Sequence, residues 1–351
     1  MSFIKKPRIL HPRTVPNGIG LTIHDYEGAM STLCAGCGHD SVSAAIIQSF
    51  FELDVPPHRV AKLSGIGCSS KTPTYFLRAA HGFNSVHGRM PSIATGANAA
   101  NRELHYIGIS GDGDSLSIGL GQLCHAIRRN VNMLYVIENN GVYGLTKGQF
   151  SASADMGSTA KKGEANHLQP IDPMLTAIDI GGSFVARGFS GDKQNLVPLI
   201  KAGIMHRGFA LLDVISPCVT FNDHEGSTKS YAYAKDHDDP LEEISFVPFF
   251  DDIEVEYEPG TTREVEMHDG SKLFLKKLEE DYNPLDKLQA MRVLSETRLR
   301  GEYATGLIYL EPDRDDFLTQ LNLIDEPLAK LGPDTVRPPK AALDKIMAAL
   351  K

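Results

Sequence analysis

Four of the five cysteines stand in segments that suit metal binding. Cys34 and Cys37 form a C-x-x-C pair, Cys68 follows in the stretch SGIGCSS, and Cys218 ends the stretch SPC. Four thiolates suit either zinc or a [4Fe–4S] cluster, because both accept tetrahedral sulfur donors. A redox-active dithiol is a third interpretation of the C-x-x-C pair, but it leaves the other two cysteines without a role. Spacing alone does not separate zinc from iron.

A second set of polar residues follows two short apolar runs. Residues 107–114 read IGISGDGD and residues 134–140 read LYVIENN, so Asp112 and Asn140 each follow an expected strand. Ligands bind at the carboxyl ends of strands in an open parallel sheet, and a helix that starts after glycine-rich backbone favours phosphate. Carboxylate and amide oxygens are ligands that Mg²⁺ prefers. The sequence therefore predicts a magnesium-diphosphate site.

Other interpretations of this segment fit less well. An NAD site is disfavoured because the glycines run G-x-x-G-x-G rather than G-x-G-x-x-G, and because the second strand ends in asparagines rather than a ribose-binding acid. Ordinary turns are common at such residues taken singly. A GDG triplet followed about 25 residues later by NN is similar to the pattern of thiamine-diphosphate enzymes. That similarity implies thiamine diphosphate and Mg²⁺, with the main-chain carbonyl of Val142 as a third protein ligand.

The order of the chain predicts one α/β domain with additions at both ends. Short apolar runs alternate with helical patterns between Cys34 and about Ser216, which is typical of a mostly parallel sheet flanked by helices. Helices are expected at 40–53, 115–130, 196–206 and 339–350, buried strands at 106–110, 132–138 and 209–215, and a hairpin or meander at 253–274. We divide the chain into an N-terminal arm (1–30), a binding domain (31–224) and a charge-rich C-terminal extension of unknown role (225–351), which packs on the core or covers a subunit interface.

Composition narrows the classes of partner. The 351 residues carry a formal net charge of −9, which offers no electrostatic footprint for nucleic acid or an anionic membrane surface. No run approaches eighteen apolar residues, and the N-terminus lacks the apolar stretch of a signal peptide. We therefore expect a cytoplasmic protein whose partners are proteins and small molecules. Cysteines that act together in that compartment should bind a metal or do redox chemistry.

From about Leu33 to Asn222 the chain resembles the β subunit of the 2-oxoacid:ferredoxin oxidoreductases. The resemblance rests on CAGCGH, SGIGCSS, HGRMPSIATG, GDGDSLSIG and ENNGVYGLTKGQFS. It implies a thiamine-diphosphate-binding fold of the pyrophosphate type, and it implies one [4Fe–4S] cluster held by Cys34, Cys37, Cys68 and Cys218. The residues that it implies around the cofactor are Ile66, Gly67, Ser69, His87, Gly111, Gly113, Asp114, Gly144 and Leu145.

The same resemblance implies an activity. It is the coenzyme A-dependent, reversible oxidative decarboxylation of a 2-oxoacid, with electrons passing through the cluster to ferredoxin. The stretch GLTKGQ resembles the form that handles 2-oxoglutarate, and Lys71 and Lys147 match positions associated with substrate selection. Their ammonium groups would pair with the distal carboxylate of 2-oxoglutarate.

Three questions stay open at the level of sequence. The glutamate that activates the cofactor is normally supplied by the α subunit in this family, so we expect the chain to be active only with that partner. Pyruvate or another 2-oxoacid is an alternative substrate. A zinc-stabilised binding module without catalytic activity is the alternative from a different class.

Overall fold

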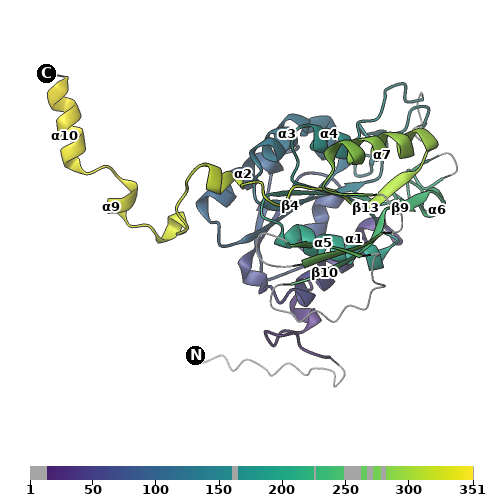
Figure 1. Ribbon diagram of the computed structural model, residues 1–351, viewed down its shortest axis with the longest axis horizontal. Helices are drawn as coiled ribbons and strands as arrows, with labels where there is room; N and C mark the ends of the chain where they lie inside the picture. The colour runs from purple at the N-terminus through teal and green to yellow at the C-terminus, as the bar shows by residue number, and fades with distance from the viewer. Residues whose placement is uncertain are drawn as a thin grey trace.

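The computed structural model describes residues 14–159, 165–224, 227–248, 262–266, 272–277 and 282–350. Within these residues the centre of the molecule is an eight-stranded sheet with the order β2-β1-β3-β4-β8-β7-β13-β9 (Figure 1). Its strands are β1 (Val60–Ser64), β2 (His81–Asn84), β3 (His105–Gly111), β4 (Met133–Asn139), β7 (Phe184–Phe189), β8 (Phe209–Ile215), β9 (Asp238–Pro240) and β13 (Tyr303–Leu310). Neighbouring strands are parallel except β13 and β7, which confirms the predicted mostly parallel sheet.

Helices cover both faces of this sheet. One face packs against α1 (Gly38–Glu52) and α5 (Lys193–Met205), and the other against α2 (Met90–Ala100), α3 (Leu120–Arg129), α4 (Pro173–Asp179) and α7 (Lys287–Arg300) (Figure 1). Every residue of β4 and β8 is buried. This is why both strands are nearly continuous apolar runs in the sequence, since a parallel sheet covered on both faces has no polar side.

The predicted elements of the core are confirmed, with one difference beside the site. The helix expected at 115–130 is a π-helical turn, η4 (Gly113–Ile118), followed by α3. Gly119 separates them. Its backbone packs against that of Gly88, and a Cβ atom added to Gly119 would lie 2.9 Å from the Gly88 carbonyl oxygen. π-helical turns within helices are frequent at functional sites.

Short elements complete the core. They are η1 (Ile23–Asp25), η2 (Pro57–Arg59), η3 (Ser69–Thr74), β5 (Val142–Tyr143), β6 (Gln149–Phe150) and α6 (Tyr231–Asp236). The predicted arm is represented by residues 14–30, and it is anchored there by Tyr26, whose side chain is fully buried. The backbone oxygen of Tyr26 accepts a hydrogen bond from the Leu77 amide at 2.6 Å.

The C-terminal part of the chain adds to the same body. Three antiparallel strands, β10 (Glu242–Val247), β11 (Thr262–Glu266) and β12 (Lys272–Lys277), form a second small sheet among the described residues. The antiparallel pair β11 and β12 falls within the hairpin or meander predicted at 253–274, whereas residues 253–261 and 267–271 lie outside the described residues. Strands β9 and β13 extend the main sheet, so this sheet includes residues on both sides of position 224. The domain boundary at that position stays a prediction.

The last elements are α8 (Phe317–Gln320), η5 (Leu328–Lys330), α9 (Pro333–Val336) and α10 (Lys340–Ala349). The helix predicted at 339–350 is confirmed as α10, but it buries no residue against this chain and projects from the body (Figure 1). No helix in the described part of the chain combines the length and apolar character needed to cross a membrane.

A buried carboxyl group gives the C-terminal part a testable pH dependence. Glu242 on β10 is 3% exposed, accepts a hydrogen bond from the Leu307 amide at 2.5 Å, and has a pKa raised well above the ordinary 4.5 by burial. Above pH 4.5 the unfolded chain loses this proton while the folded chain keeps it. Stability therefore falls as pH rises, by about 1.4 kcal/mol per pH unit for this one group.

We expect Glu242→Gln to remove that dependence, because glutamine keeps the acceptor oxygen and cannot ionise. The measurement is the free energy of unfolding in urea at pH 5 and at pH 8 for both proteins. Glu296→Gln, at an exposed position of α7, is the matched control and should change nothing. We expect the stability difference between Glu242→Gln and the natural protein to be larger at pH 8 than at pH 5. An equal difference at the two pH values would show that Glu242 is ionised in the folded chain.

Candidate functional site

The loops that follow β1, β2, β3 and β4 meet at the carboxyl edge of the sheet, where they border a pocket of about 120 Å³. The nine residues implied as cofactor contacts all line it, together with Asp112, Asn140, Val142 and Cys68. His39, Tyr143 and Thr146 also line it, and the sequence reasoning missed them. Residues spread over more than a hundred positions of the chain are thus brought to one place.

Asp112 is held in a fixed orientation at the centre of this edge. Its Oδ2 atom accepts hydrogen bonds from the Gly141 amide at 2.9 Å, from the Ser153 hydroxyl at 2.5 Å and from the Ser151 hydroxyl. None of the described residues donates to Oδ1. The carboxylate therefore has one oxygen fixed by the protein and one available, as a ligand of Mg²⁺ requires.

Asn140 stands beside Asp112 on the adjacent strand end. It is 5% exposed, and its Oδ1 atom accepts only the Val142 amide, at 3.1 Å, from the described residues. Its own carbonyl oxygen accepts a hydrogen bond from the Asn222 side chain at 2.8 Å. Carboxylate, amide and main-chain oxygens from Asp112, Asn140 and Val142 thus share one pocket, and these hard donors fit a magnesium ion. The serines at 151 and 153 were missed, although their alternation in SASAD places both on one side of an extended segment.

Asp114 organises the loops around the pocket. Its Oδ1 atom accepts hydrogen bonds from the Gly88 amide at 2.7 Å and the Ile66 amide at 3.3 Å, and it contacts the His87 ring. Its Oδ2 atom accepts a hydrogen bond from the Ser110 hydroxyl at 2.5 Å. A buried carboxylate with several donors ties together segments that follow three different strands. Asp114 lines the pocket, but its carboxylate is fully engaged in holding the pocket walls.

The four predicted cysteines converge on one side of the pocket. The Cys34 thiol accepts a hydrogen bond from the Thr220 hydroxyl at 3.5 Å. Thr220 stands two residues after Cys218, so this bond brings the first and last of the four cysteines close together. Burial raises the pKa of Cys37 to about 12, with the charge of Cys218 among the smaller causes. Burial also raises the pKa of Cys68, and the charges of Cys218 and Cys34 contribute. All four are free thiols, and a metal must displace their protons on binding.

Gly144 lies close to two of these thiols at the edge of the pocket. A Cβ atom on Gly144 would lie 3.5 Å from Sγ of Cys68 and 3.6 Å from Sγ of Cys218, which is ordinary van der Waals contact. Gly144 and Cys68 both line the pocket. The two thiols and the cofactor pocket are therefore adjacent at this point.

The spacing of the thiols bears on the choice of metal. In the described part of the chain no three His, Cys, Asp or Glu side chains lie close enough together to hold a single ion. Tetrahedral zinc needs sulfurs about 3.8 Å apart, from Zn–S bonds of about 2.3 Å. A [4Fe–4S] cluster binds each thiolate to a different iron, so its ligands stand farther apart. Four thiolates are donors that either group accepts, so the choice of the cluster over zinc stays a prediction.

A buried acid and histidine lie beneath the cysteines. Glu138 is fully buried, and neither of its carboxyl oxygens accepts a hydrogen bond from the described residues. Burial raises its pKa well above the ordinary value and lowers the pKa of His39, 3.5 Å away, to about 4. Burial therefore favours the neutral form of both groups, and His39 is neutral near pH 7. The His39 ring contacts the Ser216 hydroxyl at 2.6 Å, which fixes it between the cofactor pocket and β8.

The two lysines expected to select the substrate do not line the pocket. Lys71 is half-buried on η3. Its charge partly offsets the rise in the pKa of Cys68 that burial causes. Lys147 is exposed in the loop between β5 and β6, and its φ of 81° lies in the left-handed region that non-glycine residues rarely adopt. Both lie on loops that border the site, and their role stays a prediction.

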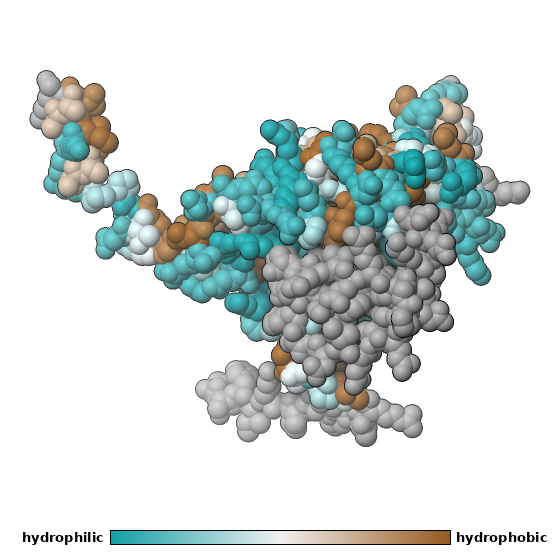
Figure 2. Space-filling model, in the orientation of Figure 1, coloured by the Kyte–Doolittle hydropathy of each residue, from teal (hydrophilic) through white to brown (hydrophobic). Residues whose placement is uncertain are grey.

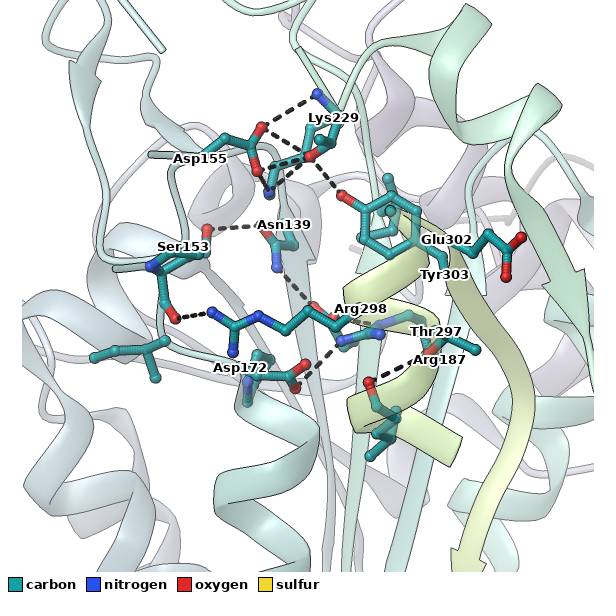
Figure 3. A pocket seen from close by; sticks show the side chains of 18 of the residues that line it. Asn139, Ser153, Asp155, Asp172, Arg187, Lys229, Thr297, Arg298, Glu302 and Tyr303 are labelled. Atoms are coloured by element: carbon teal, nitrogen blue, oxygen red, sulfur yellow. Dashed lines mark hydrogen bonds and ion pairs between the residues drawn. The ribbon is translucent and has the colours of Figure 1, made fainter. Parts of the chain in front are cut away.

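A larger cavity of about 250 Å³ lies behind Asn139, between the core and the C-terminal part (Figure 3). Arg187 lies in it, with Nε 2.9 Å from Asp213 and Nη2 3.4 Å from Asp172, and Lys229 lies 3.0 Å from Asp155. These charges neutralise one another across the junction with α7 and β13. Asp213 also accepts the Asn139 side chain at 3.0 Å, which links the ion pairs to the strand end that carries Asn140.

Comparison with known proteins gives the class first. Residues 65–214 match the thiamine pyrophosphate enzyme C-terminal TPP-binding domain. This stretch begins directly after β1 and includes β3, β4 and all but the last residue of β8, and it contains every lining residue of the pocket described above except His39. The chain thus carries a thiamine-diphosphate-binding domain.

Relatives then give the family. The chain is 43% identical to the 2-oxoacid:ferredoxin oxidoreductase subunit beta of Saccharolobus solfataricus over 199 residues, which span 56% of this chain and 65% of that relative, slightly less than two thirds of it. It is 34% identical to the 2-oxoglutarate synthase subunit KorB of Methanocaldococcus jannaschii over 189 residues, 54% of this chain and 69% of the relative. The chain belongs to the family of 2-oxoacid:ferredoxin oxidoreductase β subunits.

A solved structure agrees with this assignment. It is a 2-oxoglutarate:ferredoxin oxidoreductase from Magnetococcus marinus with 2-oxoglutarate, coenzyme A and succinyl-CoA bound. The TM-score is 0.72 at 29% sequence identity, and the match covers 94% of this chain and 96% of that chain. The likeness therefore extends over the C-terminal part as well as the core.

The ion pairs of the larger cavity generate a stability prediction. Arg187→Met leaves Asp213 and Asp172 without their buried counter-charge, so we expect the free energy of unfolding to fall by about 3–5 kcal/mol. Arg298→Met, at the exposed rim of the same cavity, should cost less than about 1 kcal/mol. Urea unfolding measures both. The pair Arg187→Met with Asp213→Asn should recover part of the loss, and an equal loss in the single and double variants would contradict the ion-pair explanation.

Proposed function

We propose that this chain is the β subunit through which a 2-oxoglutarate:ferredoxin oxidoreductase converts 2-oxoglutarate and coenzyme A to succinyl-CoA and CO₂, reversibly, with ferredoxin as the electron acceptor. The observation that carries the proposal is the position of Cys68 and Gly144. Both line the pocket at the ends of β3 and β4, and Gly144 lies close to the thiols of Cys68 and Cys218. An electron-accepting group held by the thiols would therefore be adjacent to a cofactor in the pocket.

Asp112, Asn140 and the carbonyl of Val142 are proposed to hold Mg²⁺ on the diphosphate. Their oxygens come from adjacent strand ends, and Ser151, Ser153 and Gly141 keep the Asp112 carboxylate from turning. Such a preorganised site binds a metal-diphosphate without having to reorient its ligands. Ile66, Gly67, Ser69, His87, Gly111, Gly113, Asp114 and Leu145 would form the walls, with Gly144 on the side of the cysteines.

Cys34, Cys37, Cys68 and Cys218 are proposed to ligate one [4Fe–4S] cluster. When bound, thiamine diphosphate supplies the electron sink for decarboxylation and the cluster accepts electrons one at a time. What this chain contributes is proximity, because Cys68 itself lines the cofactor pocket, and burial, which favours the neutral forms of Glu138 and His39 close to the thiols.

An α subunit is proposed to complete the site. A pocket of about 120 Å³ is small beside the roughly 300–1,000 Å³ typical of sites that enclose a ligand, so this chain forms one wall rather than a closed cavity. The missing wall, including an acid that activates the cofactor, would come from that partner. We further propose that the enzyme works in the cytoplasm, where thiols stay reduced.

The first test is anaerobic purification of the chain together with its candidate α subunit. We expect about four irons per chain, a matching amount of sulfide, bound thiamine diphosphate, and dye reduction that needs both 2-oxoglutarate and coenzyme A. Cys68→Ser should remove cluster iron and dye reduction, whereas Cys124→Ser, the same change at the fifth cysteine, should keep both. Zinc in place of iron, with no turnover of any 2-oxoacid, would contradict the proposal.

The lysines generate a prediction about the substrate. If Lys71 and Lys147 pair with the distal carboxylate of 2-oxoglutarate, replacing both with methionine should lower kcat/KM for 2-oxoglutarate roughly tenfold to a hundredfold. Turnover of pyruvate, which lacks that carboxylate, should change little. Lys201→Met, which breaks a pair between α5 and Glu52 at the end of α1 and does not touch the pocket, is the control. Equal losses on both substrates would mean that the lysines do not select the substrate.

A further inference from the structure

Two segments that carry predicted cluster ligands lie against each other. Residues 34–39 hold the C-x-x-C pair, and residues 216–220 hold the last of the four cysteines. The Gly38 amide donates a hydrogen bond to the Pro217 carbonyl at 3.4 Å, and the bond at the Cys34 thiol joins the other ends of the segments. The distance between these segments therefore sets the distance between their thiols.

Gly38 lets the segments come this close. A Cβ atom on Gly38 would lie 2.6 Å from Oγ of Ser216 and 2.7 Å from Oγ of Ser190, well inside van der Waals contact. The same point is 3.0 Å from the main-chain carbonyl carbon of Ser216, so a side chain there would displace main chain as well. The close approach is thus required immediately before His39, whose side chain makes the next contact.

His39 makes a buried contact between the two segments. Its Nδ1 atom lies 2.6 Å from Oγ of Ser216, and the residue is 1% exposed. The same nitrogen lies 3.5 Å from a carboxyl oxygen of Glu138. Ser216 is itself held, because its amide donates a hydrogen bond to the Asn139 carbonyl at 2.8 Å. The His39 ring is therefore fixed between the ends of β4 and β8.

This contact lies beside the cofactor pocket. His39 stands two residues after Cys37, and Ser216 stands two residues before Cys218. The His39 side chain also lines the cofactor pocket, as Cys68 does. A single buried hydrogen bond therefore connects the segments of two predicted ligands at the wall of the pocket.

We propose that His39 is a positioning residue, whose hydrogen bond to Ser216 fixes the separation of Cys37 and Cys218 and so holds the cluster against the cofactor pocket. The inference rests on the proposed cluster, but it uses a hydrogen bond to which the proposed function assigns no role. Hydrogen bonds to the sulfurs and exposure to solvent set the potential of a cluster. Releasing the two segments changes both, so the loss of this bond shifts the cluster's potential as well as turnover.

The two ring nitrogens separate this role from a direct contact with the cofactor. Asparagine places its amide group close to the position of Nδ1, and glutamine places it close to that of Nε2. His39→Asn can therefore keep the bond to Ser216, whereas His39→Gln keeps only a contact made by the far nitrogen. His39→Ala keeps neither.

The main experiment uses the complex with the α subunit, purified without oxygen. It records bound iron, the electron paramagnetic resonance signal of the reduced cluster, its midpoint potential and kcat. We expect His39→Ala to shift the signal and the potential and to lower kcat about a hundredfold, the loss that a misplacement of about 1 Å can cause. His39→Asn should restore the natural signal and potential and recover most of the turnover.

His125→Asn is the matched control, because His125 is exposed on α3 and lies in neither segment. Figure 2 shows a mainly hydrophilic surface over α3, where a solvated histidine makes no such link. All four measurements should keep their natural values in this control. Restoration by His39→Gln rather than His39→Asn, a His39→Asn variant no better than His39→Ala, or natural values in His39→Ala would each overturn the proposal.

Ser216→Ala tests the same bond from its other side and removes only one oxygen atom. It should reproduce the shifted signal, and in the double variant with His39→Asn the rescue should disappear, because that rescue works through Ser216. Bound iron with a natural signal and potential in Ser216→Ala overturns the proposal. Iron absent from the natural complex would overturn the proposed cluster together with this inference, whereas iron present with unaffected variants overturns this inference alone.

Discussion

The arrangement on which the site depends is the approach of two cysteine thiols to Gly144 at the edge of the pocket. The thiols belong to Cys68 and Cys218, in loops that follow β1 and β8, and Cys68 and Gly144 both line the pocket at the ends of β3 and β4. A Cβ atom on Gly144 would lie in van der Waals contact with both sulfurs, at 3.5 and 3.6 Å. The order of strands makes this meeting unavoidable, because four neighbouring parallel strands end at the same edge.

The rest of the site consists of groups that hold this arrangement still. Three donors fix one oxygen of Asp112, and Asp114 ties the loops after β1 and β2 to the start of η4. The C-terminal part takes part in the same network, since Arg187, Asp213 and Asn139 connect the junction with β13 to the end of β4. That part of the chain therefore supports the site from behind as well as extending the sheet.

The sequence predicted the core well for physical reasons that are visible in particular residues. Strand β8 was predicted to the residue, because a strand buried on both faces is an uninterrupted apolar run between polar loops. Asp112 and Asn140 were predicted because they follow such strands directly, whereas the residues expected around the cofactor came from the family resemblance. The π-helical turn at Gly113–Ile118 was not predicted, since it results from the contact of Gly119 with Gly88, which are distant in sequence.

Other features depend on contacts that no local pattern encodes. The two serines that fix Asp112 come from a loop some 40 residues away, and the pairing of β13 with β7 joins segments more than a hundred residues apart. The amphipathic pattern of 339–350 predicted a helix correctly, but the pattern does not state against which surface the helix packs. The structure shows that its apolar stripe is not covered by its own body.

The central claim is that a cluster bound by the four thiols lies against Gly144, beside the cofactor pocket. Anomalous scattering at the iron edge, from crystals of the complex grown without oxygen, tests this most directly. The account predicts iron density among Cys34, Cys37, Cys68 and Cys218, beside Gly144 and the pocket that holds density for the diphosphate. Density at the zinc edge instead, or iron bound away from Cys68 and Cys218, would contradict it.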